Sequence, residues 1–387
     1  MADLPYEVIS DILTRLPVIY LLRFRSVCKS WRSLIDNRRF ISVHLKNPIH
    51  TNLILSNDSD LYQIDFPNLN GAVPLNHPLM CYSNSITLLG SCNGLLCICN
   101  VADDIAFWNP SLRKYRILPC LPSTRRSDAD ASLLAVRVYG FGHESFAGDY
   151  KLVRILFLYD WHNRSFESQV KLYSLRTNSW KTLPSMPYAL CCARTMGVFV
   201  GNALHWVVTR KLEPNQPDLI VAFDLRLEVF LVVPLPEIGD EGNFEIDVAL
   251  LGGCLCMIVN YQDTRVDVWL MKKYGSKDSW CKVFSLMKSR EMRSLKSVRP
   301  LGYSSDGSKV LLEQDRKKLF WYNMKDEQVT CVRIPGVHNL NEGMICMGSL
   351  VSPSSLGENC RKQRKLGCEN TRKRRDDFLS QGFKLTL

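Results

Sequence analysis

The sequence predicts an α+β multidomain protein with three parts: a small N-terminal helical unit, an all-β propeller-like domain and a basic tail. Three observations support this division. Apolar residues recur at helical spacing in the first part, short strand-like runs recur at a period of about 45–65 residues in the second, and basic residues crowd the third. We place the parts at residues 1–45, 50–350 and 355–387.

The composition suits a folded protein with a sizeable core, because 46% of the 387 residues are hydrophobic and 22% are charged. The longest apolar run, residues 248–259, is too short to cross a bilayer, so no membrane span is predicted. Residues 1–6 include an acid and a proline where a signal peptide has basic charge and then an apolar run. We therefore expect a protein made in the cytosol.

The cysteines indicate neither disulfides nor a metal. There are fifteen, an odd number, and none forms a C-x-x-C pair. Cys97 and Cys99, like Cys254 and Cys256, lie two apart in apolar runs, which places each pair on one face of a strand. We expect buried free thiols in a reducing compartment, and no metal or other cofactor.

The first helix is predicted to begin near Asp3, which can cap it, with Pro5 and Glu7 in its first turn. Pro17 ends it, because a proline ring cannot sit in a helix interior. Between them one apolar stripe recurs at steps of three and four residues: Val8, Ile9, Ile12, Leu13 and Leu16.

A second helix is predicted after Pro17 as one run to Ile35, and a short third helix over about residues 38–45. The apolar positions of the second run are Leu21, Leu22, Phe24, Val27, Cys28, Trp31, Leu34 and Ile35. A unit this small carries more apolar residues than its interior can hide. Part of the stripe therefore either docks on another protein or packs on the rest of this chain.

The stretch LPYEVISDILTRLPVIYLLRFRSVCKSWRSLI resembles the F-box of plant proteins, in its L-P-x-E start, its L-x-R-L-P turn and its R-F-R-x-V-C-K-x-W-R-x-L-I second half. The resemblance implies docking onto a Skp-type adaptor, which binds the cullin scaffold of a ubiquitin ligase. Trp31 is the strongest candidate for a dominant contact. Carried over position by position, the adaptor-binding residues are Leu4, Pro5, Ile9, Ile12, Leu13, Leu16, Pro17, Leu22, Val27, Cys28 and Trp31.

The second part alternates two kinds of segment, which suits the four-stranded blades of a propeller. Strand count fits about six blades, and a pair of two-sheet sandwiches is the alternative. One kind has an aromatic-bearing strand, a polar turn and a second strand, with copies starting at Ala106, Val170, Val221, Val266 and Lys318. The other joins apolar strands through a Gly-containing turn, with copies starting at Gly90, Gly197, Leu250 and Tyr303.

This part also resembles a family, the F-box-associated domain of plants, in NPSLRKYRILP, VKLYSLRTNSWK and VDVWLMKKYGSKDSWCKVFSL. The resemblance implies a substrate-binding domain. The ending TRKRRDDFLSQGFKLTL resembles the subgroup tied to constitutive expression of pathogenesis-related genes. In that subgroup the implied protein substrates are intracellular immune receptors of the nucleotide-binding, leucine-rich-repeat type.

Single residues of the second part are interpreted as structural. His205 is expected to be a packed core histidine, and a set of tryptophans at matching places in the repeats is expected to form blade core: Trp108, Trp180, Trp206, Trp269, Trp280 and Trp321. Surface loops are the better candidates for recognition. These loops begin at Ser123, Asp160, Arg210 and Pro236.

The tail carries two basic clusters, and its residues 361–375 hold eight basic residues and one acid. The two clusters can form a two-part nuclear import signal, a solvated tail or a phosphate-binding arm. We expect residence in the cytoplasm and the nucleus. The import candidates are Arg361, Lys362, Arg364, Lys365, Arg372, Lys373, Arg374 and Arg375.

The sequence lacks a nucleophile elbow, a phosphate loop, an H-E-x-x-H motif and paired acids, so no intrinsic catalysis is predicted. The function expected is substrate recognition for a Skp-cullin-F-box ubiquitin ligase, which sends its target to proteasomal degradation. The alternative is a glycan- or small-ligand-binding propeller in which the F-box is secondary. A nucleic-acid regulator ranks last, because no base-reading motif is present.

Overall fold

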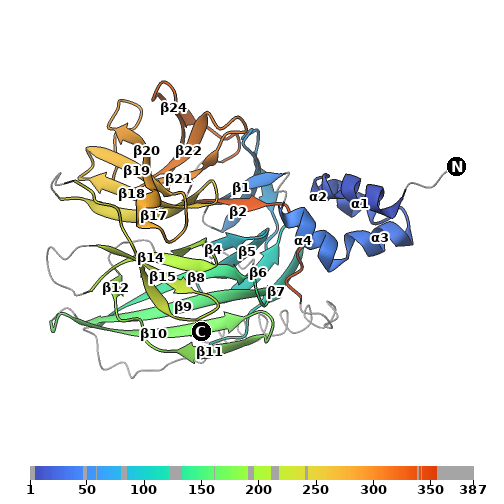
Figure 1. Ribbon diagram of the computed structural model, residues 1–387, viewed down its shortest axis with the longest axis horizontal. Helices are drawn as coiled ribbons and strands as arrows, with labels where there is room; N and C mark the ends of the chain where they lie inside the picture. Colours follow the sequence, from blue (N-terminus) through green and yellow to red (C-terminus); the bar gives the residue numbers. More distant parts are fainter. Residues whose placement is uncertain are drawn as a thin grey trace, which may run out of the picture.

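The computed structural model describes residues 5–46, 50–57, 59–79, 85–121, 133–160, 162–190, 196–210, 218–239, 243–337, 340 and 342–354. Within them a small group of helices lies at one end of a larger all-β domain (Figure 1). The predicted fold class, helical unit followed by propeller, is confirmed. The tail from residue 355, with its nuclear-import candidates, lies outside the described residues.

Four helices make up the N-terminal unit: α1 (Tyr6–Thr14), α2 (Val18–Phe24), α3 (Lys29–Ile35) and α4 (Arg38–Lys46). The prediction of one continuous second helix is wrong. The chain becomes extended at Cys28, whose sulfur accepts a hydrogen bond from the Trp31 amide at 3.4 Å and caps α3. Pro5 occupies the N-cap position of α1, and Asp3, the predicted cap, lies outside the described residues.

The β domain consists of six four-stranded antiparallel units, numbered here along the chain. Units 3 and 4 share a nine-stranded sheet. In it β13 (Met196–Val200) pairs in parallel with β8 (Leu133–Glu144), and β12 (Ala189–Leu190) adds to β14 (Ala203–Thr209). Unit 1 is β25 (Glu342–Met347), β1 (Thr51–Asn57), β2 (Asp60–Phe66) and β3 (Val73–Leu75). Unit 2 is β4 (Ile86–Cys92), β5 (Leu95–Asn100), β6 (Ile105–Asn109) and β7 (Lys114–Ile117). Unit 3 is β8 (Leu133–Glu144), β9 (Asp149–Asp160), β10 (Ser165–Ser174) and β11 (Ser179–Leu183).

The remaining units follow the same order. Unit 4 is β13 (Met196–Val200), β14 (Ala203–Thr209), β15 (Leu219–Asp224) and β16 (Phe230–Val233). Unit 5 is β17 (Glu245–Leu251), β18 (Cys254–Tyr261), β19 (Arg265–Met271) and, after the short helix η1 (Lys277–Ser279), β20 (Trp280–Met287). Unit 6 is β21 (Val298–Tyr303), β22 (Lys309–Gln314), β23 (Lys318–Asn323) and β24 (Val329–Val332).

The packing between units closes a ring. One hydrophobic cluster lies between each unit and the next, and a sixth joins unit 6 back to unit 1 through Leu311 and Leu53. Unit 1 takes its inner strand from the far end of the domain, since β25 pairs with β1 in the register Leu53↔Ile345. This arrangement is a propeller of six units, and it excludes the pair of sandwiches.

The expected core residues behave as predicted. His205 is 0% exposed, Trp206 is 2% exposed, and Trp108 and Trp280 are also buried, while the other three tryptophans are half-buried. Cys97 and Cys99 face the same cluster between units 2 and 3, and no disulfide joins the described cysteines. Cys28, Cys120 and Cys331 are exposed, so the expectation of buried thiols is wrong for these three. None of the described helices is long and apolar enough to cross a membrane.

The strand directions divide the connections between two faces. In an antiparallel unit the turns after the first and third strands lie at one end, and the connections after the second and fourth strands lie at the other. The helices join at the first of these ends, where Gly348 donates its amide to His50 at 3.0 Å. We call this end the proximal face and the other the distal face. The predicted recognition loop beginning at Ser123 lies outside the described residues, and the other three loops lie partly outside them. The strands that precede all four, β7, β9, β14 and β16, end on the distal face.

Apolar contacts hold the helical unit against the proximal face. Side chains of the helices pack on the ring, and a side chain from the segment after β25 packs in the core of the helices. Ile41 and Leu45 of α4 pack against the cluster between units 2 and 3, and Leu350 enters the core of the helices. The buried Asn109 amide donates to the carbonyls of Ser349 (3.0 Å) and Val351 (2.7 Å). The segment after β25 therefore joins helices and ring into one body.

Candidate functional site

The helical unit has an inner face that forms its own core. The buried side chains there include Leu13, Val18, Leu21 and Ile35, and α4 packs against them. His44 of α4 donates its Nε2–H to the Leu16 carbonyl at 3.0 Å, which satisfies a group left free at the end of α1. The core fixes how α1, α2 and α3 present their other sides.

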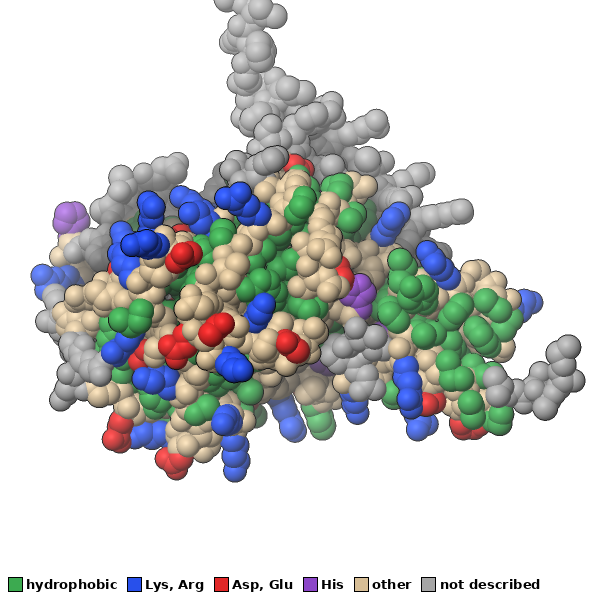
Figure 2. All heavy atoms as spheres, turned by 90° about the horizontal axis from the view of Figure 1, so that it is seen from above, with side chains coloured by type: hydrophobic (Ala, Val, Ile, Leu, Met, Phe, Trp, Pro, Cys, Tyr) green, Lys and Arg blue, Asp and Glu red, His purple; other side chains and the backbone are tan. Residues whose placement is uncertain are grey.

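The solvent-exposed side of α1–α3 carries several large apolar residues among charged and polar ones, and hydrophobic side chains gather over this unit in Figure 2. Tyr6 (57% exposed), Ile19 (56%) and Val27 (63%) are among the most exposed large apolar residues of the described chain. We name the outer side the helical apolar surface, with the members Tyr6, Val8, Ile12, Ile19, Tyr20 and Val27. A surface of this kind on so small a unit marks a protein-binding site.

The residues predicted to bind the adaptor fall into three groups. Pro5, Ile12, Val27 and Cys28 are exposed, whereas Leu13 is only 2% exposed and belongs to the unit's own core. Leu4 lies outside the described residues. The others are half-buried along the edge of the core: Ile9, Leu16, Pro17, Leu22 and Trp31.

Tyr6, Ile19 and Tyr20 belong to this surface and are not among the adaptor-binding residues predicted from the sequence. A signal was present for two of them. Val18, Ile19 and Tyr20 are consecutive apolar residues at the start of a helix, and successive helical side chains point about 100° apart. Only Val18 turns inward, so the other two face solvent.

Trp31 is held at the boundary between core and surface. Its ring packs edge-on against Phe24 with centroids 5.5 Å apart, and Phe24 is itself half-buried. Nearby, Cys28 is exposed, and hydrogen bonds from Ser30 and the Trp31 amide lower the pKa of its thiol. Arg25 and Asp36 pair at 2.8 Å across the ends of α2 and α3, which fixes the turn that displays Val27.

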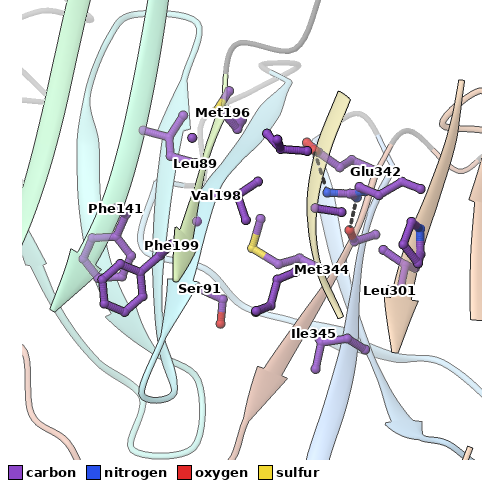
Figure 3. A pocket seen from close by; sticks show the side chains of 18 of the residues that line it. Leu89, Ser91, Phe141, Met196, Val198, Phe199, Leu301, Glu342, Met344 and Ile345 are labelled. Carbon is purple, nitrogen blue, oxygen red and sulfur yellow. Dashed lines mark hydrogen bonds and ion pairs between the residues drawn. The ribbon is translucent and has the colours of Figure 1, made fainter. Parts of the chain in front are cut away.

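A second candidate is the cavity of about 130 Å³ at the centre of the ring (Figure 3). Inner strands of all six units line it, with Leu89, Met196, Val198 and Met344 turned toward the space. Ser91 supplies a hydroxyl, and no histidine or cysteine stands among the described residues of the lining.

Two arginines line the cavity, Arg299 and Arg316, and the charge of Arg299 is already neutralised. Arg299 Nε donates to Glu313 Oε2 at 2.8 Å, and Arg299 NH1 lies 3.9 Å from Glu342 Oε1. Burial acts to lower the pKa of Arg299, but the two carboxylates raise it above its usual value. Glu313 also accepts the Gly343 amide at 3.2 Å, so the cluster ties β22 to β25. The described residues hold no group of three His, Cys, Asp or Glu side chains able to bind a metal ion.

Comparison with known proteins agrees with this division. A family model described as F-box domain matches residues 1–42, and one described as F-box associated beta propeller domain matches residues 52–347. The chain is 37% identical to the F-box protein CPR1 of Arabidopsis thaliana, with 100% of both chains covered. It is 31% identical to a second Arabidopsis thaliana F-box protein over 100% of both chains. An Arabidopsis thaliana F-box/kelch-repeat protein is 27% identical over 92% of this chain and 97% of that protein.

The helical apolar surface thus lies within the matched F-box, and the six-unit ring within the matched propeller domain. F-box proteins are generally substrate adaptors, and their F-box implies binding to a Skp-type adaptor. The chain belongs to the F-box proteins that carry an F-box-associated β-propeller domain.

Proposed function

We propose that this protein is the substrate-recognition subunit of a Skp-cullin-F-box ubiquitin ligase, and that it directs its target to proteasomal degradation. The observation that carries the proposal is the helical apolar surface, presented by a unit that is fixed to one face of a closed ring. The helices bind the adaptor, and the adaptor joins the complex to the cullin. The ring binds the target.

The receptor contributes geometry to the reaction. Holding a target beside the ubiquitin-carrying enzyme turns a bimolecular encounter into an effectively intramolecular one. Such a role needs a rigid connection between the two binding sites, and the buried bonds of Asn109 to residues 349 and 351 supply one. The ring itself makes and breaks no covalent bond.

The target proposed is an intracellular immune receptor of the nucleotide-binding, leucine-rich-repeat type. Full-length similarity to the F-box protein CPR1 supports a role in plant defence. We further propose residence in both cytoplasm and nucleus, on the strength of the two basic clusters between residues 361 and 375.

Adaptor capture with surface variants tests the proposal. Ile12 is 49% exposed on the helical apolar surface, and Val43 is 41% exposed on α4 outside that surface, which makes them a matched pair. Ile12→Asp is expected to lower affinity for a purified Skp-type adaptor by about tenfold or more, because a charge is buried in an apolar contact. Val43→Asp should bind as the unchanged chain does. Failure of the unchanged chain to bind the adaptor, or equal binding by Ile12→Asp, contradicts the proposal.

A further inference from the structure

Seven exposed basic side chains gather on the distal face, where the connection from β20 to β21 meets the turn between β22 and β23. Figure 2 shows a group of Lys and Arg side chains at the end of the molecule remote from the helices, and others elsewhere on the same face. We name this set the basic platform: Lys288, Arg290, Arg293, Lys296, Arg316, Lys317 and Lys318.

Hydrogen bonds join the segments that carry the basic platform into one surface, although these segments are separate in the sequence. Asp315 donates its amide to the Ser297 carbonyl at 2.8 Å, and the Ser297 amide returns a bond to Asp315 Oδ1 at 3.2 Å. The Gln314 amide group donates to the Ser294 carbonyl. From unit 5, Asn260 donates to the Leu295 carbonyl at 2.8 Å. Two neighbouring units therefore hold the platform between them.

Buried anchors hold the longer segment in place. Met292 and Leu295 are both 0% exposed and belong to the core between units 5 and 6. Ser289 and Met292 exchange hydrogen bonds of 3.0 and 3.1 Å, which closes the turn that carries Arg290. The charges are thus presented by an ordered segment, and a ligand need not order it on binding.

The acids of these segments do not neutralise the platform. Asp263 pairs with Lys288 at 2.7 Å and also accepts the Leu295 amide, and the Lys288 bond is the main cause of its lowered pKa. Asp315 is engaged with the backbone. Glu291 is exposed, and Glu313 is paired with Arg299. These four acids stand against the seven platform residues and Arg299, a net charge of +4. Within the described residues, no ion pair or side-chain hydrogen bond engages the six platform side chains other than Lys288.

We infer that the basic platform binds an acidic segment of a protein partner, an extended stretch rich in Asp and Glu. Guanidinium groups bind carboxylates in a two-bonded geometry, and Arg290, Arg293 and Arg316 supply three of them. The distal position leaves the helical apolar surface clear. The inference rests on the proposed function, under which the partner is the substrate.

Other anionic partners fit the platform less well. Residues 287–298 and 313–318 contain no aromatic side chain on which a base could stack. A membrane surface calls for several exposed apolar anchors beside the charges, and within these two segments Met287 alone is an exposed large apolar residue.

The test measures binding of the full-length chain to a fluorescein-labelled peptide of alternating Glu and Ser, by fluorescence anisotropy. The platform variant is Arg290→Glu/Arg293→Glu. The matched control is Lys272→Glu/Lys273→Glu, which reverses two exposed charges of unit 5 on the proximal face, in the turn between β19 and β20. We expect affinity to fall with added salt, and to fall about tenfold or more in the platform variant but not in the control.

Three results would overturn the inference: no saturable binding by the unchanged chain, equal loss in the two variants, or tighter binding of a single-stranded oligonucleotide than of the peptide. Adaptor capture by the same preparations keeps the two hypotheses apart. A chain that captures the adaptor but does not bind the peptide contradicts only the inference that the basic platform binds an acidic segment. A chain that binds the peptide but not the adaptor overturns the proposed function.

Discussion

His205 and Tyr274 form a hydrogen bond that fastens unit 4 to unit 5, with the histidine buried and the tyrosine 42% exposed. The Tyr274 hydroxyl lies 2.8 Å from His205 Nε2, and His205 Nδ1 lies 2.9 Å from the Val198 carbonyl oxygen. A carbonyl can only accept, so Nδ1 carries the proton and Nε2 accepts from the tyrosine. Burial lowers the pKa of His205 to about 4, which keeps the ring neutral in this arrangement.

This histidine makes stability depend on pH. Its folded pKa of about 4 lies below the unfolded value of about 6.5, so its contribution is complete above pH 6.5 and is lost as the pH falls toward 4. The loss is roughly 3 kcal/mol across that window. Urea unfolding at several pH values checks it. His205→Gln should be less stable than the unchanged chain at neutral pH and should show a shallower decline, and parallel curves for the two proteins would contradict the assignment.

Leu13 and Ile12 are neighbours in α1, but substitution of Leu13 is expected to lower stability and substitution of Ile12 to weaken adaptor binding. Leu13→Ala removes a side chain that is 2% exposed and should destabilise the protein by about 2–4 kcal/mol, without changing adaptor affinity of the molecules that stay folded. Ile12→Ala should change stability by about 0.5 kcal/mol or less and weaken adaptor binding. Thermal unfolding and adaptor capture, measured together, separate the two. Weaker adaptor capture by fully folded Leu13→Ala would show that Leu13 contacts the adaptor, which would contradict its assignment to the core.

The Arg299 cluster is expected to matter for closure of the ring. Arg299→Met leaves Glu313 buried without its cation, and Glu313 is 2% exposed, so a loss of about 3–5 kcal/mol is expected in urea unfolding. The double variant Arg299→Met/Glu313→Met should recover part of that loss, since no uncompensated charge remains. A double variant as unstable as the single one would show that packing, and not charge, sets the cost.

Substitution of Gly94 tests the contact between the ring and the segment that holds the helical unit. It has φ +76°, and a Cβ there would lie 2.4 Å from the Ser349 hydroxyl oxygen and 2.7 Å from the Met347 carbonyl oxygen. Gly253 has a similar φ of +81° and open space around it, so it controls for backbone strain. Gly94→Ala should therefore lower the melting temperature more than Gly253→Ala does. Hydrogen exchange should also rise in α4 for Gly94→Ala, and equal effects of the two substitutions would contradict the close contact.

The propeller fold could be predicted because the repeats carry their own turn residues and aromatic strands. The number of units could be placed only at about six, because five copies of one kind of segment and four of the other can be recognised. The break between α2 and α3 could not be predicted, because Phe24, Val27 and Cys28 keep helical spacing across it. A cysteine cap gives a weaker signal than Ser, Thr, Asp or Asn. The division of the apolar stripe into core and surface depends on where α4 packs, and no spacing within α1 encodes that.

The basic platform could not be predicted from charge runs, because its two segments are separate in the chain and each is only moderately basic. Ring topology brings them together on one face. The same topology ends the strands before the four candidate loops on one face, and the sequence alone could not establish that common side.

The closure of the ring by β25 has a consequence for how the protein is made. The helical unit leaves the ribosome first, yet Leu350 completes its core and β25 completes unit 1. A chain that stops before residue 342 would leave β1 with one edge unpaired, and such an edge promotes aggregation. We therefore expect prematurely terminated chains to be removed as misfolded protein. They would not persist as adaptor-bound receptors that lack a working target site.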